Sequence, residues 1–97
     1  MIFIVRNQAK IANRYLRFAK WKIRNLSSKF GELLYSEIYV NQVTHHPATY
    51  DVTIRMGVTG PDIIVSAQSS NLKELWSELS NKMKRQLARN SKRRHQN

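Results

Sequence analysis

The sequence predicts an α+β domain with the element order β-α-β-β-β-α. Two observations carry this prediction. Long segments near both ends of the chain repeat apolar side chains every three or four residues, which is the spacing of amphipathic helices. The remaining segments are short, rich in β-branched and aromatic residues and bounded by turn residues, which is typical of strands.

The opening residues, MIFIV, are apolar and end at Arg6. They are long enough for a strand and too short for a membrane span or the core of a signal peptide. Residues 1–31 are also basic and free of acids, as transit peptides are, but their removal would take away a strand and a helix. We therefore read them as part of the fold.

The first helix is expected within residues 8–30, with Gly31 at its C-terminal cap. The helical spacing of three and four residues places one set of apolar side chains on a single stripe. This predicted stripe consists of Ile11, Tyr15, Phe18, Ala19, Ile23, Leu26 and Phe30.

Three strands are expected next, at residues 36–43, 49–56 and 62–68. The second of these alternates, with Tyr50, Val52, Ile54 and Met56 on one face and polar side chains on the other, so it is predicted to be half-buried. The sequences THHP at 44–47 and GVTGPD at 57–62 predict the two connecting turns.

The last helix is expected to begin after Asn71, an N-cap residue, with Glu74 completing a capping box. We expect a single domain at residues 1–93 and a basic flexible tail at 94–97. The closing residues SKRRHQN are predicted to be disordered. The apolar stripe of this helix is predicted to contain Leu72, Leu75, Trp76, Leu79, Met83 and Leu87.

The net charge of +11 is sorted along the chain. Residues 1–31 hold eight basic residues and no acid, and residues 82–97 hold seven basic residues and no acid. The middle, residues 32–81, holds all six acids and only two basic residues. A chain that needed only solubility would mix its charges, so this pattern predicts two basic surfaces that contact the phosphates of RNA.

Helical spacing places these cations on the exposed sides of both helices. In the last helix, Lys82, Arg85 and Arg89 recur about one turn apart, opposite the apolar stripe. In the first helix, Trp21 falls among basic side chains, where it either covers the seam between helix and sheet or stacks on a base. We favour the seam. The other exposed residues predicted on the first helix are Lys10, Arg14, Arg17, Lys20 and Arg24.

Nothing in the sequence indicates catalysis or a bound cofactor. There is no Cys, and the chain lacks the nucleophile-elbow, P-loop, dinucleotide and zinc-protease motifs. His45 and His46 lie in an expected loop and His95 in the tail, without further ligands nearby. We predict no enzyme, no catalytic residue, no metal site, no cofactor and no small-molecule substrate.

The order of elements and three segments resemble the ribosome hibernation-promoting factor family, which includes the ribosome-associated inhibitor proteins. The segments are IANRYLRFAKWKIRNLSSKF at 11–30, VSAQSSNL at 65–72 and KMKRQLAR at 82–89. The resemblance implies a four-stranded sheet with both helices on one face, similar to a double-stranded-RNA-binding domain with an added strand.

The resemblance also implies a function. A member of this family would bind the decoding channel of the small ribosomal subunit in the cytoplasm during stationary phase and stress, and would exclude tRNA and mRNA. The chain is not expected to carry the dimerising C-terminal domain of long members, and no membrane contact is implied. By position, Lys22, Lys82, Arg85 and Arg89 match basic residues of the family, and the full expected RNA-binding set adds Arg17, Lys20, Arg24, Lys92 and Arg93.

Two other functions fit the charge pattern. A general double-stranded-RNA-binding module would bind any long duplex, whereas a hibernation factor would prefer the assembled small subunit. A basic amphipathic helix can also lie on an anionic membrane or on a partner protein. The sheet is expected to cover the apolar stripes of both helices, which leaves little to insert into lipid.

Overall fold

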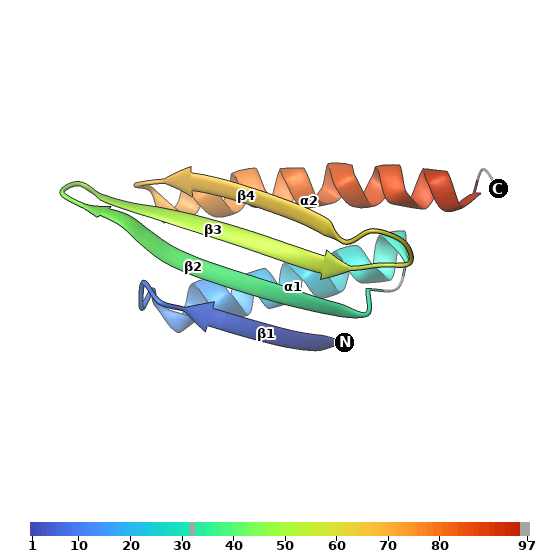
Figure 1. Ribbon diagram of the computed structural model, residues 1–97, viewed down its shortest axis with the longest axis horizontal. Coiled ribbons are helices and arrows are strands. Elements are labelled where there is room, and N and C mark those ends of the chain that lie inside the picture. The colour runs from blue at the N-terminus through green and yellow to red at the C-terminus, as the bar shows by residue number, and fades with distance from the viewer. Residues whose placement is uncertain (32, 96–97) are drawn as a thin grey trace.

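A computed structural model describes the backbone of residues 1–31 and 33–95, and the side chains of 1–31 and 33–91. The predicted element order is confirmed (Figure 1). The elements are β1 (Ile2–Asn7), α1 (Asn13–Phe30), β2 (Tyr35–His45), β3 (Ala48–Gly57), β4 (Ile63–Ser69) and α2 (Leu72–His95).

The four strands form one mixed sheet in the order β1-β2-β3-β4. β1 runs parallel to β2, and α1 provides the crossover that a parallel pair requires. β2, β3 and β4 are antiparallel neighbours joined by the two predicted turns. Both helices lie on the same face of the sheet, as expected, and α2 projects beyond the sheet at its C-terminal end (Figure 1).

The core fills the space between the helices and this face of the sheet. Alternate strand residues point into it, and the predicted inward side chains Val52, Ile54 and Met56 are fully buried. The apolar stripe of α2 is confirmed. Its members Leu75, Trp76, Leu79, Met83 and Leu87 are buried, and Leu72 is partly buried against the same core.

The N-terminal part of the α1 prediction was wrong in two respects. The helix fills only Asn13–Phe30 of the expected range 8–30. Its buried row includes Leu16, which was not predicted there, and leaves out Phe18, which was. Each residue turns a helix by 100°, so Phe18 points 100° away from its buried neighbour Ala19. Its side chain therefore stays 46% exposed.

Hydrogen bonds explain why the helix begins late. The Asn7 side chain accepts a hydrogen bond from the Ile11 N–H at 3.0 Å and donates one to the Ile11 carbonyl at 2.9 Å. Lys10, inside this loop, has a φ of 55° and so cannot belong to a helix. Ile11 is still buried, but it reaches the core from the loop.

The caps of both helices agree in part with the prediction. Gly31 ends α1 with a φ of 113°, a conformation that favours glycine, and its N–H bonds to the Ser27 carbonyl. Asn71 caps α2 by accepting from the N–H groups of Lys73 and Glu74. The reciprocal half of the expected capping box does not form, because the Asn71 N–H donates to Ser69 Oγ at 3.0 Å.

α2 continues as a helix to His95. The disorder predicted for residues 91–97 was therefore wrong for residues 91–95. Residues 96 and 97, and the side chains of the predicted tail at 94–97, lie outside the described residues. The flexibility of that tail therefore stays a prediction.

A polar cluster fixes the loop between β3 and β4 on the open face of the sheet. The Asp62 carboxylate accepts hydrogen bonds from the Tyr35 hydroxyl and from Arg55 Nε, the latter at 2.7 Å. These two bonds, that of Tyr35 first, lower the pKa of Asp62. The Tyr35 ring also covers Gly57 so closely that a β-carbon there would collide with it, so this strand position requires glycine.

The two tryptophans should differ sharply in their effect on stability. Trp76 is 4% exposed, so Trp76→Ala should lower the free energy of unfolding by roughly 3–5 kcal/mol. Trp21 is 55% exposed, so Trp21→Ala should cost no more than about 1 kcal/mol. Urea unfolding followed by circular dichroism measures both values. Equal, large losses would contradict the orientation of α1.

The Asp62 cluster should make stability depend on pH. Because the folded pKa of Asp62 lies below its unfolded value of about 3.9, its contribution is present above roughly pH 5 and is lost as the pH falls through the folded pKa. Asp62→Asn should therefore lower the Tm at pH 7, and the difference from wild type should shrink toward pH 2.

Asp51 supplies the matched control, because it lies in β3 and makes no side-chain hydrogen bond to any described residue. Asp51→Asn should leave the Tm close to that of wild type throughout the pH range. A Tm difference for Asp62→Asn that is the same at pH 7 and pH 2 would refute the role given to its carboxylate.

Candidate nucleic-acid interface

The charge that is sorted along the sequence is sorted between the two layers of the fold. α1 contains no acid, and its charged side chains lie outside the core. The open face of the sheet instead holds Glu37 and Asp51, on outward strand positions, and Asp62, in the loop between β3 and β4. Tyr39 donates a hydrogen bond to the Glu37 carboxylate, so this acid is already engaged. The helical layer is therefore the basic side of the molecule.

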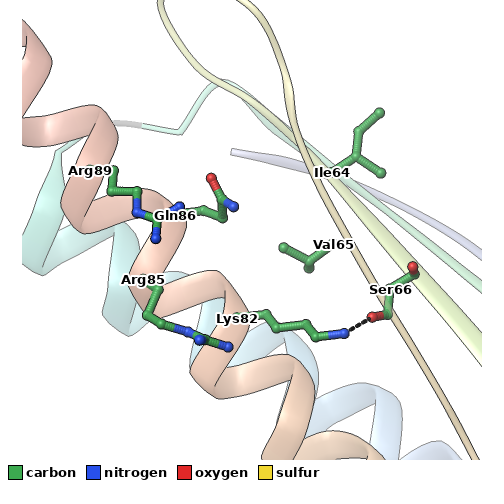
Figure 2. A pocket seen from close by; sticks show the side chains of 7 residues that line it. All are labelled: Ile64, Val65, Ser66, Lys82, Arg85, Gln86 and Arg89. Carbon is green, nitrogen blue, oxygen red and sulfur yellow. Dashed lines mark hydrogen bonds between the residues drawn. The ribbon is translucent and has the colours of Figure 1, made fainter.

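The three basic residues predicted on α2 lie together along the edge of the sheet. Lys82, Arg85 and Arg89, with Gln86 between them, form one wall of a groove of about 360 Å³. β4 forms the other wall through Ile64, Val65 and Ser66 (Figure 2). The helix thus holds three cations at fixed intervals beside an edge strand.

Lys82 differs from its two neighbours because it is already engaged. Its Nζ donates a hydrogen bond to the Ser66 carbonyl at 2.7 Å (Figure 2). The same Nζ lies 3.2 Å from the Glu78 carboxylate. It therefore ties α2 to the edge of the sheet and satisfies a carbonyl that no further strand reaches. Arg85 and Arg89 are exposed and make no hydrogen bond or ion pair with any described residue, so they are the cations of this groove that are open to a partner.

A second groove follows the seam between the two helices. Near the start of α1 it has a volume of about 590 Å³, with an apolar floor that includes Tyr15, Phe18 and Trp76. Arg14, Lys22 and Lys73 carry the charge of its lining. Further along, a hollow of about 610 Å³ is lined by Phe30, Asn81, Lys84, Arg85 and Ala88, so Arg85 lies between the seam and the edge groove.

The predicted residues of α1 are divided between two flanks. Lys22 faces α2 across the seam. Lys20 and Arg24 lie on the other flank, where their charged groups are 6.0 Å and 5.0 Å from the centre of the Phe3 ring in β1. Arg17 is exposed on the outer side of the helix. The side chains of Lys92 and Arg93 lie outside the described residues.

Sequence reasoning missed two residues of the seam, Lys73 and Lys84. They are eleven residues apart, which returns an α-helix to nearly the same direction after three turns. That spacing was a usable signal. It was hidden because Lys73 lies in the acidic middle of the sequence, which was not expected to contribute to a basic surface.

The expectation that Trp21 covers the seam between helix and sheet was wrong. Its side chain is 55% exposed and its ring contacts that of Phe18, with 6.1 Å between the ring centres. It lies on the outer side of α1 because Ile23 and Ala19, two residues to either side, face the core.

His46 lies in the turn at the tip of the β2–β3 hairpin, as predicted for a loop. The loop prediction was wrong for His45, which is the last residue of β2 and pairs with Ala48 of β3. Among the described residues, no three His, Cys, Asp or Glu side chains gather closely enough to hold a metal ion. Within the same part of the chain, neither helix combines the length and apolar character that crossing a bilayer requires.

Two solved structures share this fold over nearly their whole length. A ribosomal subunit interface protein from Coxiella burnetii matches with a TM-score of 0.76 at 17% identity, over 92% of this chain and 96% of that one. The N-terminal domain of Protein Y from Thermus thermophilus matches with a TM-score of 0.70 at 13% identity, over 91% and 93%. No protein-family model and no curated protein sequence matches the chain. At these identities the likeness establishes the fold.

Proposed function

We propose that this chain is a ribosome-associated factor that binds ribosomal RNA of the small subunit through its helical layer. By occupying the decoding channel it would exclude tRNA and mRNA and hold the ribosome inactive, in stationary phase and under stress. The observation that carries the proposal is the pair of exposed, unengaged guanidinium groups of Arg85 and Arg89 beside the β4 edge. The fold shared with a ribosomal subunit interface protein supports the choice of partner.

Phosphate groups suit this surface for two physical reasons. Arg presents a planar set of donors that bonds two phosphate oxygens at once. A helix also fixes the separation of its cations. Less conformational entropy is therefore lost when these side chains bind RNA than when a flexible segment does. Lys22, Arg17, Lys20 and Arg24 extend the same surface along α1, and Lys92 and Arg93 continue the basic sequence of α2.

The runner-up functions use the same surface differently. A general double-stranded-RNA-binding module would need only duplex phosphates, and the shared fold favours a subunit-specific partner over it. A membrane-surface role would need free apolar side chains on the helices. Their apolar rows instead pack against the sheet, and the exposed exceptions on α1 are Phe18 and Trp21. We propose no catalytic activity and no cofactor for this protein. A factor that binds ribosomes in this way would be located in the cytoplasm.

Reversing two charges tests the proposal. Arg85→Glu and Arg89→Glu together should leave the fold intact, because neither side chain makes a hydrogen bond or an ion pair with a described residue. The variant should lose pelleting with small subunits, since each site then repels phosphate. Lys82 is left unchanged because it ties α2 to Ser66. Circular dichroism confirms folding.

Three controls make the result specific. Arg6→Glu alters net charge by half as much as the double reversal, but Arg6 lies on β1 beside Tyr39, so Arg6→Glu should pellet like wild type. Deleting residues 91–97 should weaken binding less than the double reversal. Wild type should bind long duplex RNA less tightly than the small subunit, and it should compete with tRNA. Undiminished pelleting of the folded double variant would refute the proposal.

A further inference from the structure

Two aromatic side chains on α1 are exposed and lie outside the hydrophobic core. Phe18 is 46% exposed and Trp21 is 55% exposed, and their rings lie 6.1 Å apart at an angle of 33°. The core behind them is closed by Leu16, Ala19 and Ile23. Large aromatics are costly to leave in water, so a pair of them on an otherwise charged helix face indicates a binding surface.

The charges around this pair all have one sign. Arg17 and Arg24 stand four residues before and three residues after Trp21, which places them one helical turn away on the same face. Arg14 lies one turn beyond Arg17, where its guanidinium is 5.0 Å from the Tyr15 ring centre. Because α1 contains no acid, no carboxylate of its own helix competes for these cations.

The Trp21 ring is not occupied by these neighbouring cations. Among the described residues, the cation–π contacts involve the rings of Tyr15, Phe3 and Phe30, and none involves Trp21. Phe18 also lines the seam groove that holds Lys22 and Lys73, so the aromatic pair adjoins a second set of cations. A ligand with a flat ring and flanking negative charges would satisfy both features.

We propose that Phe18 and Trp21 form a stacking platform for an unpaired base of single-stranded RNA. The phosphates on either side of that base would bind Arg17 and Arg24, and the strand would continue toward Lys22 in the seam. Aromatic faces stack on any base, while basic side chains hold the backbone. This inference rests on the proposed function and deepens it, because it adds to duplex contacts a site that only a splayed or single-stranded nucleotide can fill.

The test compares two strands that carry the same phosphates. An oligoadenylate of about eight nucleotides, within the usual site size of single-strand-binding proteins, is measured against an abasic ribose-phosphate strand of equal length. Wild type should bind the oligoadenylate roughly 5- to 150-fold more tightly, which corresponds to the usual contribution of one stacked base. Oligoadenylate should also quench the Trp21 fluorescence, obtained as the difference between wild type and Trp21→Phe.

Two substitutions separate stacking from simple apolar contact. Trp21→Phe keeps an aromatic face and should retain most of the preference for the oligoadenylate. Trp21→Leu keeps apolar volume without an aromatic face and should lose most of it. Ile2→Ala, which removes another exposed apolar side chain from the sheet layer, should leave the preference unchanged.

The outcomes distinguish this inference from the function on which it rests. If wild type pellets with small subunits but binds both strands equally, the stacking site is refuted and the proposed function stands. If wild type does not bind small subunits at all, the proposed function fails. Undiminished preference in Trp21→Leu would also refute stacking. Binding to phosphatidylserine vesicles that Trp21→Leu abolishes, without any preference between the strands, would assign the aromatic pair to a membrane.

Discussion

Both helices bury their apolar rows against one face of a single sheet, and this packing decides where the remaining side chains of the helices can lie. Ile23 of α1 and Leu79 of α2 are fully buried in the same core as Ile38 and Ile54 of the sheet. Turning α1 by one residue would bring Arg24 to the place of Ile23. That change would give up burial worth about 1.5–3 kcal/mol and would bury an unpaired charge as well. The basic side chains are therefore held outward by the core itself.

The same constraint gives similar cations different roles. Lys82 extends from α2 to the edge strand, where it donates a hydrogen bond to the Ser66 carbonyl and pairs with the Glu78 carboxylate. Arg85 and Arg89 occupy the same groove without such contacts among the described residues. On α1, Lys20 and Arg24 lie over an aromatic ring of β1, while Arg17 remains exposed. A surface that looks uniform by charge count thus contains a lysine that ties the helix to the sheet, Lys82, and cations that are open to a binding partner, Arg85 and Arg89 among them.

The sequence alone was sufficient where short-range physics decides the structure. Strict alternation located the buried face of β3, and Asn71 marked the start of α2 because a side-chain oxygen there can accept from free helical N–H groups. It failed where contacts outside these periodic patterns decide. The Asn7–Ile11 hydrogen bonds hold the chain in a loop before α1, and the helical spacing does not reveal them. The Tyr35 ring over Gly57 and the Arg55–Asp62 pair likewise depend on strand pairing that local patterns do not specify.

The candidate surface shows the same division. The charge blocks at the two ends predicted a basic helical layer, but the sequence could not separate Lys82 from Arg85, because the difference lies in a contact with β4 sixteen residues away. Trp21 was misplaced since a large aromatic residue is more often buried than exposed, and only the orientation of the whole helix overrides that tendency.

The salt dependence of binding to small ribosomal subunits tests the central claim most directly, because it counts the phosphates that the helical layer neutralises. If six to ten phosphates are contacted, affinity should fall by about 10³- to 10⁵-fold between 50 and 200 mM salt. An affinity that stays flat across this range would contradict the claim that the sorted charges of the helical layer are the binding surface.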